Sequence, residues 1–347
     1  MVRSVLLTRN TVRGIPNLVT LADGTEVPTQ NFSLKPLPFF ASPSNTSSSG
    51  NINSFGAKLS QKLGKKLTNK YSKFNIRGDC STNRTIDTAI GISIWANVEF
   101  ISVYNGKNDP LIDPVAYYNY TLPESANKQH IDRYNSIQPT IKKISNALTE
   151  TFGVPLPSKS NIQLTSFSGL LKIESTLAEE PTFSKISNID LNISKENSFI
   201  IPQGTVSKQY VYNIPLYCQQ VSSNILQHIL NLFNFTKNNK NKENEIDIIV
   251  QSDDYISATA SLLGLNFKIE TLPQNYLNAN SGLLFVLDDN NNVSIQCLGL
   301  NIHQEYVKSD VLQKTSLHKF NTLVTSKINP KYVNLRDINN VINYRTT

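Results

Sequence analysis

Residues able to contact an anionic ligand gather in one short stretch, KLSQKLGKKLTNKYSKFNIRGDC, at positions 58–80. It holds seven lysines and arginines before its first acid, Asp79. Leucines at positions 59, 63 and 67 recur at helical spacing, so residues 56–78 are expected to form an amphipathic helix with a lysine-rich face. Lysines neutralise phosphates without precise geometry, and interleaved aromatic rings stack on unpaired bases. The residues expected to bind nucleic acid are Lys58, Lys62, Lys65, Lys66, Lys70, Tyr71, Lys73, Phe74 and Arg77.

This charge pattern has other interpretations. The same stripe suits an anionic membrane surface, or the solvated face of a helix that packs through its leucines. Residues 1–78 carry 11 lysines and arginines but only two acids, whereas the rest of the chain is nearly neutral. A cationic segment ahead of a neutral body favours a polyanionic partner, and we prefer nucleic acid by a narrow margin.

A pair of acids, Asp253 and Asp254, follows the apolar run IDIIV. In open sheets, ligands bind beyond the carboxyl ends of strands, so Asp253 could contact a metal ion or a ribose there. An N-cap residue and a first-turn acid at the start of a helix explain both side chains without a ligand. We prefer this capping interpretation.

Other catalytic signatures are missing from the sequence. The four histidines and three cysteines are dispersed, and no spacing typical of a zinc site, a nucleophile motif or a phosphate-binding loop occurs. We therefore predict no catalytic residue, no metal ligand and no cofactor. The dispersed residues are His130, His228, His303 and His318, with Cys80, Cys218 and Cys297.

The apolar periodicity predicts an α+β protein: a strand-rich central region with amphipathic helices, followed by a small C-terminal α/β unit. Strands are expected at 90–100 and within 161–218, and helices at 134–152 and near 225–233. Beyond the polar segment 236–245 we expect a strand at 246–250, a helix from 252 to 264, a strand at 266–272 and a hairpin over 282–300. Helical segments near 305–325 and 336–343 end the chain. The predicted units are 1–55 (leader and linker), 56–78 (basic helix), 79–236 (α+β domain) and 246–347 (α/β domain).

The N-terminal residues have the composition of a mitochondrial presequence, since they are basic, apolar and free of acids before Asp23. An N-terminal strand or arm with scattered arginines explains the same composition. No apolar run is long enough for a membrane span. We expect a mitochondrial matrix location, or otherwise a cytoplasmic one.

Together these features favour a non-enzymatic RNA-associated organellar protein, such as a ribosome component or gene-expression accessory factor, with RNA and possibly ribosomal protein partners. One alternative is an enzyme whose site lies in the 246–300 unit at the carboxyl ends of its strands. Another is a self-assembling, capsid-like protein with a basic arm.

Overall fold

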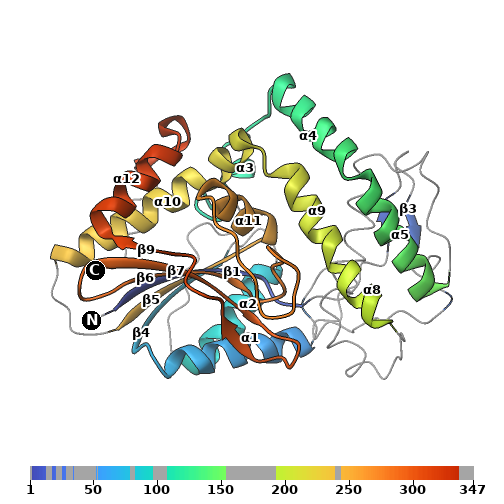
Figure 1. Ribbon diagram of the computed structural model, residues 1–347. Helices are drawn as coiled ribbons and strands as arrows, with labels where there is room; N and C mark the ends of the chain where they lie inside the picture. The colour runs from blue at the N-terminus through green and yellow to red at the C-terminus, as the bar shows by residue number, and fades with distance from the viewer. Residues whose placement is uncertain are drawn as a thin grey trace.

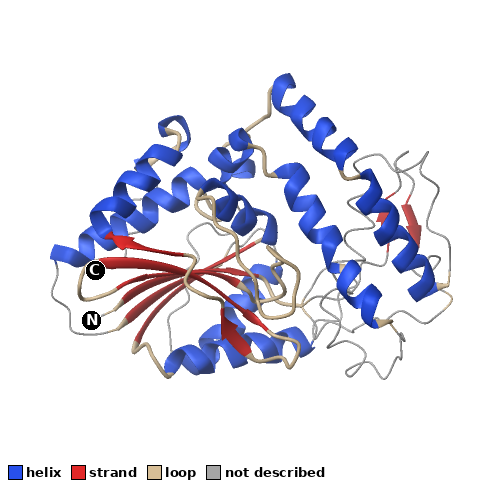
Figure 2. Cartoon of the chain, viewed as in Figure 1, coloured by secondary structure: helices blue, strands red, loops and turns tan. Residues whose placement is uncertain are grey.

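The computed structural model describes residues 2–12, 18–20, 26–28, 34, 52, 54–78, 83–96, 108–153, 193–238 and 244–335. Within these ranges the chain forms a mixed α/β structure around one twisted sheet (Figures 1 and 2). The expected α+β class is confirmed in this broad form.

The sheet has seven strands in the order β4-β5-β1-β6-β7-β8, with β9 also paired to β7. Strands β4, β5 and β1 run parallel, whereas β6, β7, β8 and β9 add antiparallel pairings. A separate small sheet pairs β2 (Leu18–Thr20) with β3 (Glu26–Pro28). The strands of the main sheet are β1 (Arg3–Arg9), β4 (Lys73–Arg77), β5 (Glu245–Gln251), β6 (Gly282–Leu287), β7 (Asn292–Leu300), β8 (Tyr306–Lys308) and β9 (Gln313–Ser316).

Helices cover both faces of this sheet, as Figure 1 shows. On the lower face, α1 (Ser54–Thr68) and α2 (Asn83–Ala96) share a core with Leu6 of β1. On the upper face, α10 (Pro215–Asn238), α11 (Asp253–Leu262) and α12 (Leu317–Lys327) share a core with Val5 and Leu7. The period-2 alternation of a strand thus sends successive residues of β1 into two different cores.

A group of helices lies beside the sheet, on the right in Figure 1. It contains α4 (Glu124–Ser136), α5 (Gln138–Phe152), α8 (Lys195–Ile200) and α9 (Pro202–Tyr212), which contact one another. Helix α9 also contacts α11, which links this group to the sheet layer. The short helices α3 (Pro114–Tyr117) and η3 (Pro330–Tyr332) contact α10.

Strand β1 accounts for the composition that resembled a presequence. All seven of its residues are buried, and it pairs with β5 on one side and β6 on the other. Its apolar residues fill the two cores, and its terminal arginines lie at the two ends of the strand. The alternative of an N-terminal strand therefore explains this segment. No helix among the described residues has the length and apolar character needed to cross a membrane.

Several predicted elements are confirmed. The helix predicted for 56–78 is confirmed as α1 only as far as Thr68, and its last part is wrong because residues 73–77 form strand β4. The helix predicted within 134–152 is α5, and the predicted strand–helix pair at 246–264 is β5 and α11. The hairpin over 282–300 is β6 and β7, joined by an Asp/Asn turn. The helix predicted near 225–233 is the 24-residue α10.

The expected strand-rich central region is wrong wherever the structure describes it. Residues 90–96 belong to α2, residues 210–218 belong to α9 and α10, and residues 266–272 form no strand. The segment near 305–325 combines β8, β9 and α12. Residues 161–192 and the predicted helix at 336–343 lie outside the described residues. The division into four units is not tested by these contacts and stays a prediction, although β1, β4 and β5 come from three distant segments.

Helix α2 forms despite its β-branched residues because small residues let it approach α1 closely. A Cβ added at Gly64 of α1 would lie 2.1 Å from the Ile92 carbonyl oxygen, and one added at Gly91 would lie 2.6 Å from the Cβ of Ser60. This packing buries the apolar face of each helix, so tertiary contacts outweigh the strand propensity of the local sequence.

The close approach of α1 and α2 makes a prediction about Gly64. In an exposed helix, replacing Gly by Ala stabilises the folded protein by about 1 kcal/mol. Here the new methyl group would force the helices apart, so we expect Gly64→Ala to lower the free energy of unfolding by about 2 kcal/mol. Urea-induced unfolding followed by circular dichroism measures this change. Gln61→Ala on the same helix should change stability by less than about 0.5 kcal/mol. A Gly64→Ala variant as stable as the native protein would contradict the described packing.

Candidate functional site

The candidate site lies where the parallel strands β5 and β1 end side by side. Helix α11 follows β5 and packs on the upper face of the sheet. Helix α1, the next described helix after β1, packs on the lower face. Neighbouring parallel strands whose connections leave toward opposite faces open a crevice at their carboxyl ends, and this is where open α/β sheets bind ligands. The residues at this crevice come from the end of β1 and the start of α11.

Arg9, the last residue of β1, is the central cation of the crevice. Its side chain is 6% exposed, and its Nη1 donates a hydrogen bond to the Leu277 carbonyl at 2.8 Å. Its Nε lies 3.8 Å from Oδ1 of Asp253, the first residue of α11. These contacts hold the guanidinium beside the positive end of the α11 dipole, an arrangement that attracts an anion.

Backbone hydrogen bonds fix the chain on both sides of this arginine. The Asn10 amide donates to the Gln251 carbonyl at 3.1 Å, which joins the ends of β1 and β5. The Thr11 amide donates to Thr88 Oγ1 at 3.0 Å, and the Thr11 hydroxyl donates to the Gly56 carbonyl at 2.8 Å. The crevice is therefore anchored to α1 and α2 below as well as to β5.

Ser252 occupies the N-cap position of α11, but its hydroxyl makes no capping hydrogen bond. It is half-buried at the mouth of the crevice, next to Asp253. The capping interpretation made one of the two acids the N-cap residue, but Ser252 holds this position and both Asp253 and Asp254 lie in the first turn of α11.

Asp254 is held by an ion pair with Lys208 of α9, at 2.7 Å between Oδ2 and Nζ. Burial alone would lower the pKa of Lys208, but the nearby carboxylates of Asp254 and Asp253 outweigh it and raise this pKa. The ammonium group therefore stays charged at neutral pH. The two acids at the start of α11 have different surroundings: Asp253 faces Arg9, and Asp254 joins α11 to α9.

A second buried arginine, Arg77, ends the neighbouring parallel strand β4. Its Nε donates to Asp109 Oδ2 at 2.5 Å, and Asp109 Oδ1 accepts from the Leu111 amide at 2.8 Å. Within the described part of the chain, neither Nη atom of Arg77 has a hydrogen-bond partner. Arg77 therefore brings a further, partly unused guanidinium to the carboxyl ends of the parallel strands.

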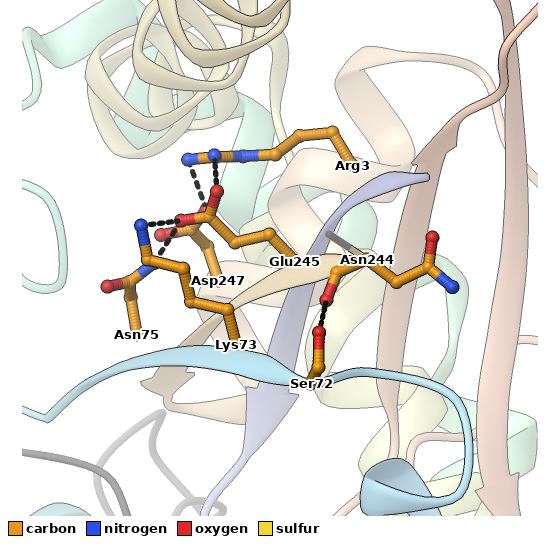
Figure 3. A network of polar contacts seen from close by, with 7 residues as sticks. All are labelled: Arg3, Ser72, Lys73, Asn75, Asn244, Glu245 and Asp247. Carbon is orange, nitrogen blue, oxygen red and sulfur yellow. Dashed lines mark hydrogen bonds and ion pairs between the residues drawn. The ribbon is translucent and has the colours of Figure 1, made fainter. Parts of the chain in front are cut away.

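The opposite, amino end of the sheet carries a polar network with a structural role (Figure 3). Arg3 of β1 makes ion pairs with Glu245 and, at 3.0 Å, with Asp247. Glu245 also accepts a hydrogen bond from the Asn75 side chain at 2.7 Å and pairs with Lys73 at 3.8 Å. These contacts join the starts of β1, β4 and β5, and the charges of the two cations and two carboxylates in the network balance.

The residues predicted to bind nucleic acid lie on or just after α1, and most of them contact other residues of the chain. Tyr71 and Phe74 are buried in the lower core, so neither ring can stack on a base and that expectation is wrong. Lys62 donates to the Gln304 carbonyl at 2.7 Å, and Lys66 donates to the Tyr306 carbonyl. Lys65 lies over the Trp95 ring and Lys70 over the Tyr71 ring. Lys58, Lys62, Lys65, Lys66, Lys70 and Lys73 are exposed, whereas Arg77 is buried.

Imidazole and thiol groups lie elsewhere in the described structure. His130 is on α4, His228 on α10, His303 between β7 and β8, and His318 on α12. Burial raises the pKa of the Cys218 thiol to about 11 and that of the Cys297 thiol to about 12, so neither is a nucleophile at neutral pH. The described residues contain no cluster of three or more His, Cys, Asp or Glu side chains able to hold a metal ion.

Sequence reasoning missed Arg9 and Lys208, and it assigned Arg77 to the end of a nucleic-acid-binding helix. Arg9 lies at the end of an apolar run, and this position was the available signal for a site residue. The sequence analysis instead assigned Arg9 to a leader segment. Lys208 had no local signal, because only the fold brings it to Asp254. Arg77 lies instead at the end of strand β4, where it pairs with Asp109.

No protein-family model matches the sequence, and no curated protein matches it either. Solved structures do match the fold. The phytase from Citrobacter braakii aligns with a TM-score of 0.73 and 14% identity, covering 96% of this chain and 98% of that one. The apo phytase of Hafnia alvei aligns with a TM-score of 0.72 and 13% identity, covering 94% of this chain and 97% of that one. The same Hafnia phytase in complex with myo-inositol hexakis sulphate aligns with a TM-score of 0.71 and 15% identity, covering 94% of this chain and 97% of that one.

This similarity of fold contradicts the hypothesis of a non-enzymatic, RNA-associated, ribosomal or mitochondrial protein. The chain has the architecture of phytases over almost its whole length, and the crevice lies at the edge of the sheet where such folds bind ligands. The alternative of an enzyme with a site at Asp253 and Asp254 agrees with the fold better than the hypothesis that we preferred.

Proposed function

We propose that the crevice between β1 and α11 binds a phosphate ester and catalyses its hydrolysis. The observation that carries this proposal is Arg9 facing Asp253 at the first turn of α11, at the place where β5 and β1 connect to opposite faces. The shared fold with phytases supports a phosphorylated substrate, and the Hafnia phytase complex with myo-inositol hexakis sulphate supports a polyanionic ring compound as the first substrate to test.

Arginine suits the binding step. Its guanidinium stays charged at all relevant pH values and presents a planar set of donors that matches phosphate oxygens. At Arg9 the contacts to Leu277 and Asp253 fix the guanidinium before the ligand arrives, so little side-chain entropy is lost on binding. The amides at the start of α11 add donors for the same anion.

Asp253 suits the chemical step. A carboxylic acid beside the bound phosphate can give its proton to the ester oxygen as the bond from phosphorus to that oxygen breaks. Asp253 would then be the carboxylate that pairs with Arg9, and solvent would restore the proton. Because no histidine lies at the crevice and both described cysteines are buried, we assign the attack on phosphorus to a water molecule. Asn10 and Ser252 are placed at the crevice to hydrogen-bond this water or a phosphate oxygen.

The binding step predicts a defined effect of Arg9→Gln. Inorganic phosphate should raise the melting temperature of the native protein, because a ligand that binds only the folded state stabilises it. In Arg9→Gln we expect the phosphate affinity, obtained from the dependence of melting temperature on phosphate concentration, to fall about tenfold or more. Lys73→Gln removes the same charge at the amino end of the sheet and should leave the affinity unchanged. Equal phosphate affinity in native protein and Arg9→Gln would exclude Arg9 as the anion ligand.

The chemical step predicts a different effect of Asp253→Asn. Loss of the proton donor should lower the rate of phosphate release from phytate about 100-fold or more, and should remove the alkaline limb of the pH–rate profile. Phosphate affinity should be retained or increased, because an anionic neighbour is gone. Asp289→Asn, at an exposed turn, is the control and should keep full activity. If native protein binds phosphate but releases none from phytate, the catalytic half of the proposal is wrong.

A further inference from the structure

A second cavity lies away from the crevice, between α9 and α11. Its volume is about 380 Å³, within the usual range for sites that hold small molecules. Residues 264–275 close one side and Arg133 of α4 lies at its edge. Apolar walls come from Val206, Ala260, Leu265 and Phe267.

One polar side chain of this cavity, Gln209 of α9, stands out. It is only 2% exposed, and neither its Oε1 nor its Nε2 has a hydrogen-bond partner in the described structure. Buried carboxamides are nearly always hydrogen bonded, because an unsatisfied buried donor or acceptor is costly. Two unsatisfied atoms on one amide that faces a cavity indicate a ligand with complementary groups.

Neighbouring polar groups already have partners within the protein. Ser257 Oγ accepts from Asn213 Nδ2 at 2.7 Å, and Asn275 Oδ1 accepts from the Phe267 amide at 2.9 Å. Arg133 Nη1 donates to the carbonyls of Tyr210 and Asn213, at 2.7 and 2.9 Å. These contacts hold the neighbouring polar groups in place. Gln209, whose amide atoms have no partner in the described structure, is therefore the group that would recognise an occupant.

We infer that this cavity binds a planar, uncharged compound with a cyclic-amide edge, of about the size of a nucleobase. A carboxamide places a donor and an acceptor side by side, and a cyclic amide presents the matching acceptor and donor. The apolar walls would enclose the faces of a flat ring. A charged compound fits poorly, because the described lining offers no carboxylate and its one cation already serves two carbonyl groups.

This site adjoins the crevice through α9. Lys208, the residue before Gln209, pairs with Asp254 at the start of α11. An occupant held between α9 and α11 would stabilise the contact that carries this ion pair. The inference does not rest on the proposed phosphatase activity, since neither Arg9 nor Asp253 lines this cavity.

Saturation-transfer NMR with uracil as the probe tests the inference, on the full chain and without phosphate. Uracil should bind the native protein, whereas 1,3-dimethyluracil, which lacks both N–H donors, should bind about tenfold more weakly or not at all. Gln209→Leu should weaken uracil binding about tenfold or more. Gln61→Leu, on α1 beneath the opposite face of the sheet, should bind like the native protein.

A second variant covers the case in which Gln209→Leu fails to fold. Val206→Phe keeps Gln209 but fills the cavity from a half-exposed position, and it should also abolish uracil binding. Undetectable binding of uracil to the native protein at millimolar concentration overturns the inference and leaves water as the occupant. Equal binding by the native protein and either cavity variant overturns it as well, because the probe would then lie elsewhere. Loss of phosphate binding in Arg9→Gln with uracil binding intact would separate the two sites.

Discussion

The structure depends on a central strand that buries an arginine at each end. Taking a guanidinium out of water is costly unless it is paired and hydrogen bonded, so the residues around β1 must supply carboxylates or carbonyls at both places. At the amino end the partners are Glu245 and Asp247, both from β5. At the carboxyl end they are the Leu277 carbonyl and Asp253. The same chemical constraint therefore has a structural solution at one end and opens a site at the other.

The difference between the two ends follows from connectivity. At the amino end, strands β1, β4 and β5 begin together, and their charged residues meet within one sheet and cancel (Figure 3). At the carboxyl end, α11 packs on the upper face of the sheet while the next described helix after β1 packs on the lower face, so the chain leaves β5 and β1 in opposite directions. Asp253 reaches Arg9 at 3.8 Å, a separation that leaves the guanidinium able to accept an additional anion. The Arg9 guanidinium therefore lies beside the amino-terminal end of α11, where the helix dipole favours an anion.

The lysine-rich face of α1 shows why charge composition alone misled the functional interpretation. Six lysines in and just after this helix are exposed, as an RNA-binding surface would require. Yet the aromatic residues expected beside them are in the core, and Lys62, Lys66 and Lys73 contact carbonyl or carboxylate oxygens of the same chain. The arginines of the proposed site are instead buried. A buried cation was a stronger indicator of a site here than a run of solvated ones, because only the buried cation has been desolvated and oriented.

The elements with strong local signals could be predicted from the amino-acid sequence. The leucine spacing of α1, the apolar run of β5 followed by α11, and the Asp/Asn turn between β6 and β7 each depend on interactions within a few residues, and each was predicted. Helix α2 was not predicted, because its formation depends on the contact of Gly91 with Ser60 on another helix. The pairing of Arg9 with Asp253, 244 positions apart in the sequence, is likewise a product of sheet order. Strand order and helix contacts join distant residues, so only the tertiary structure decided which charges form the crevice.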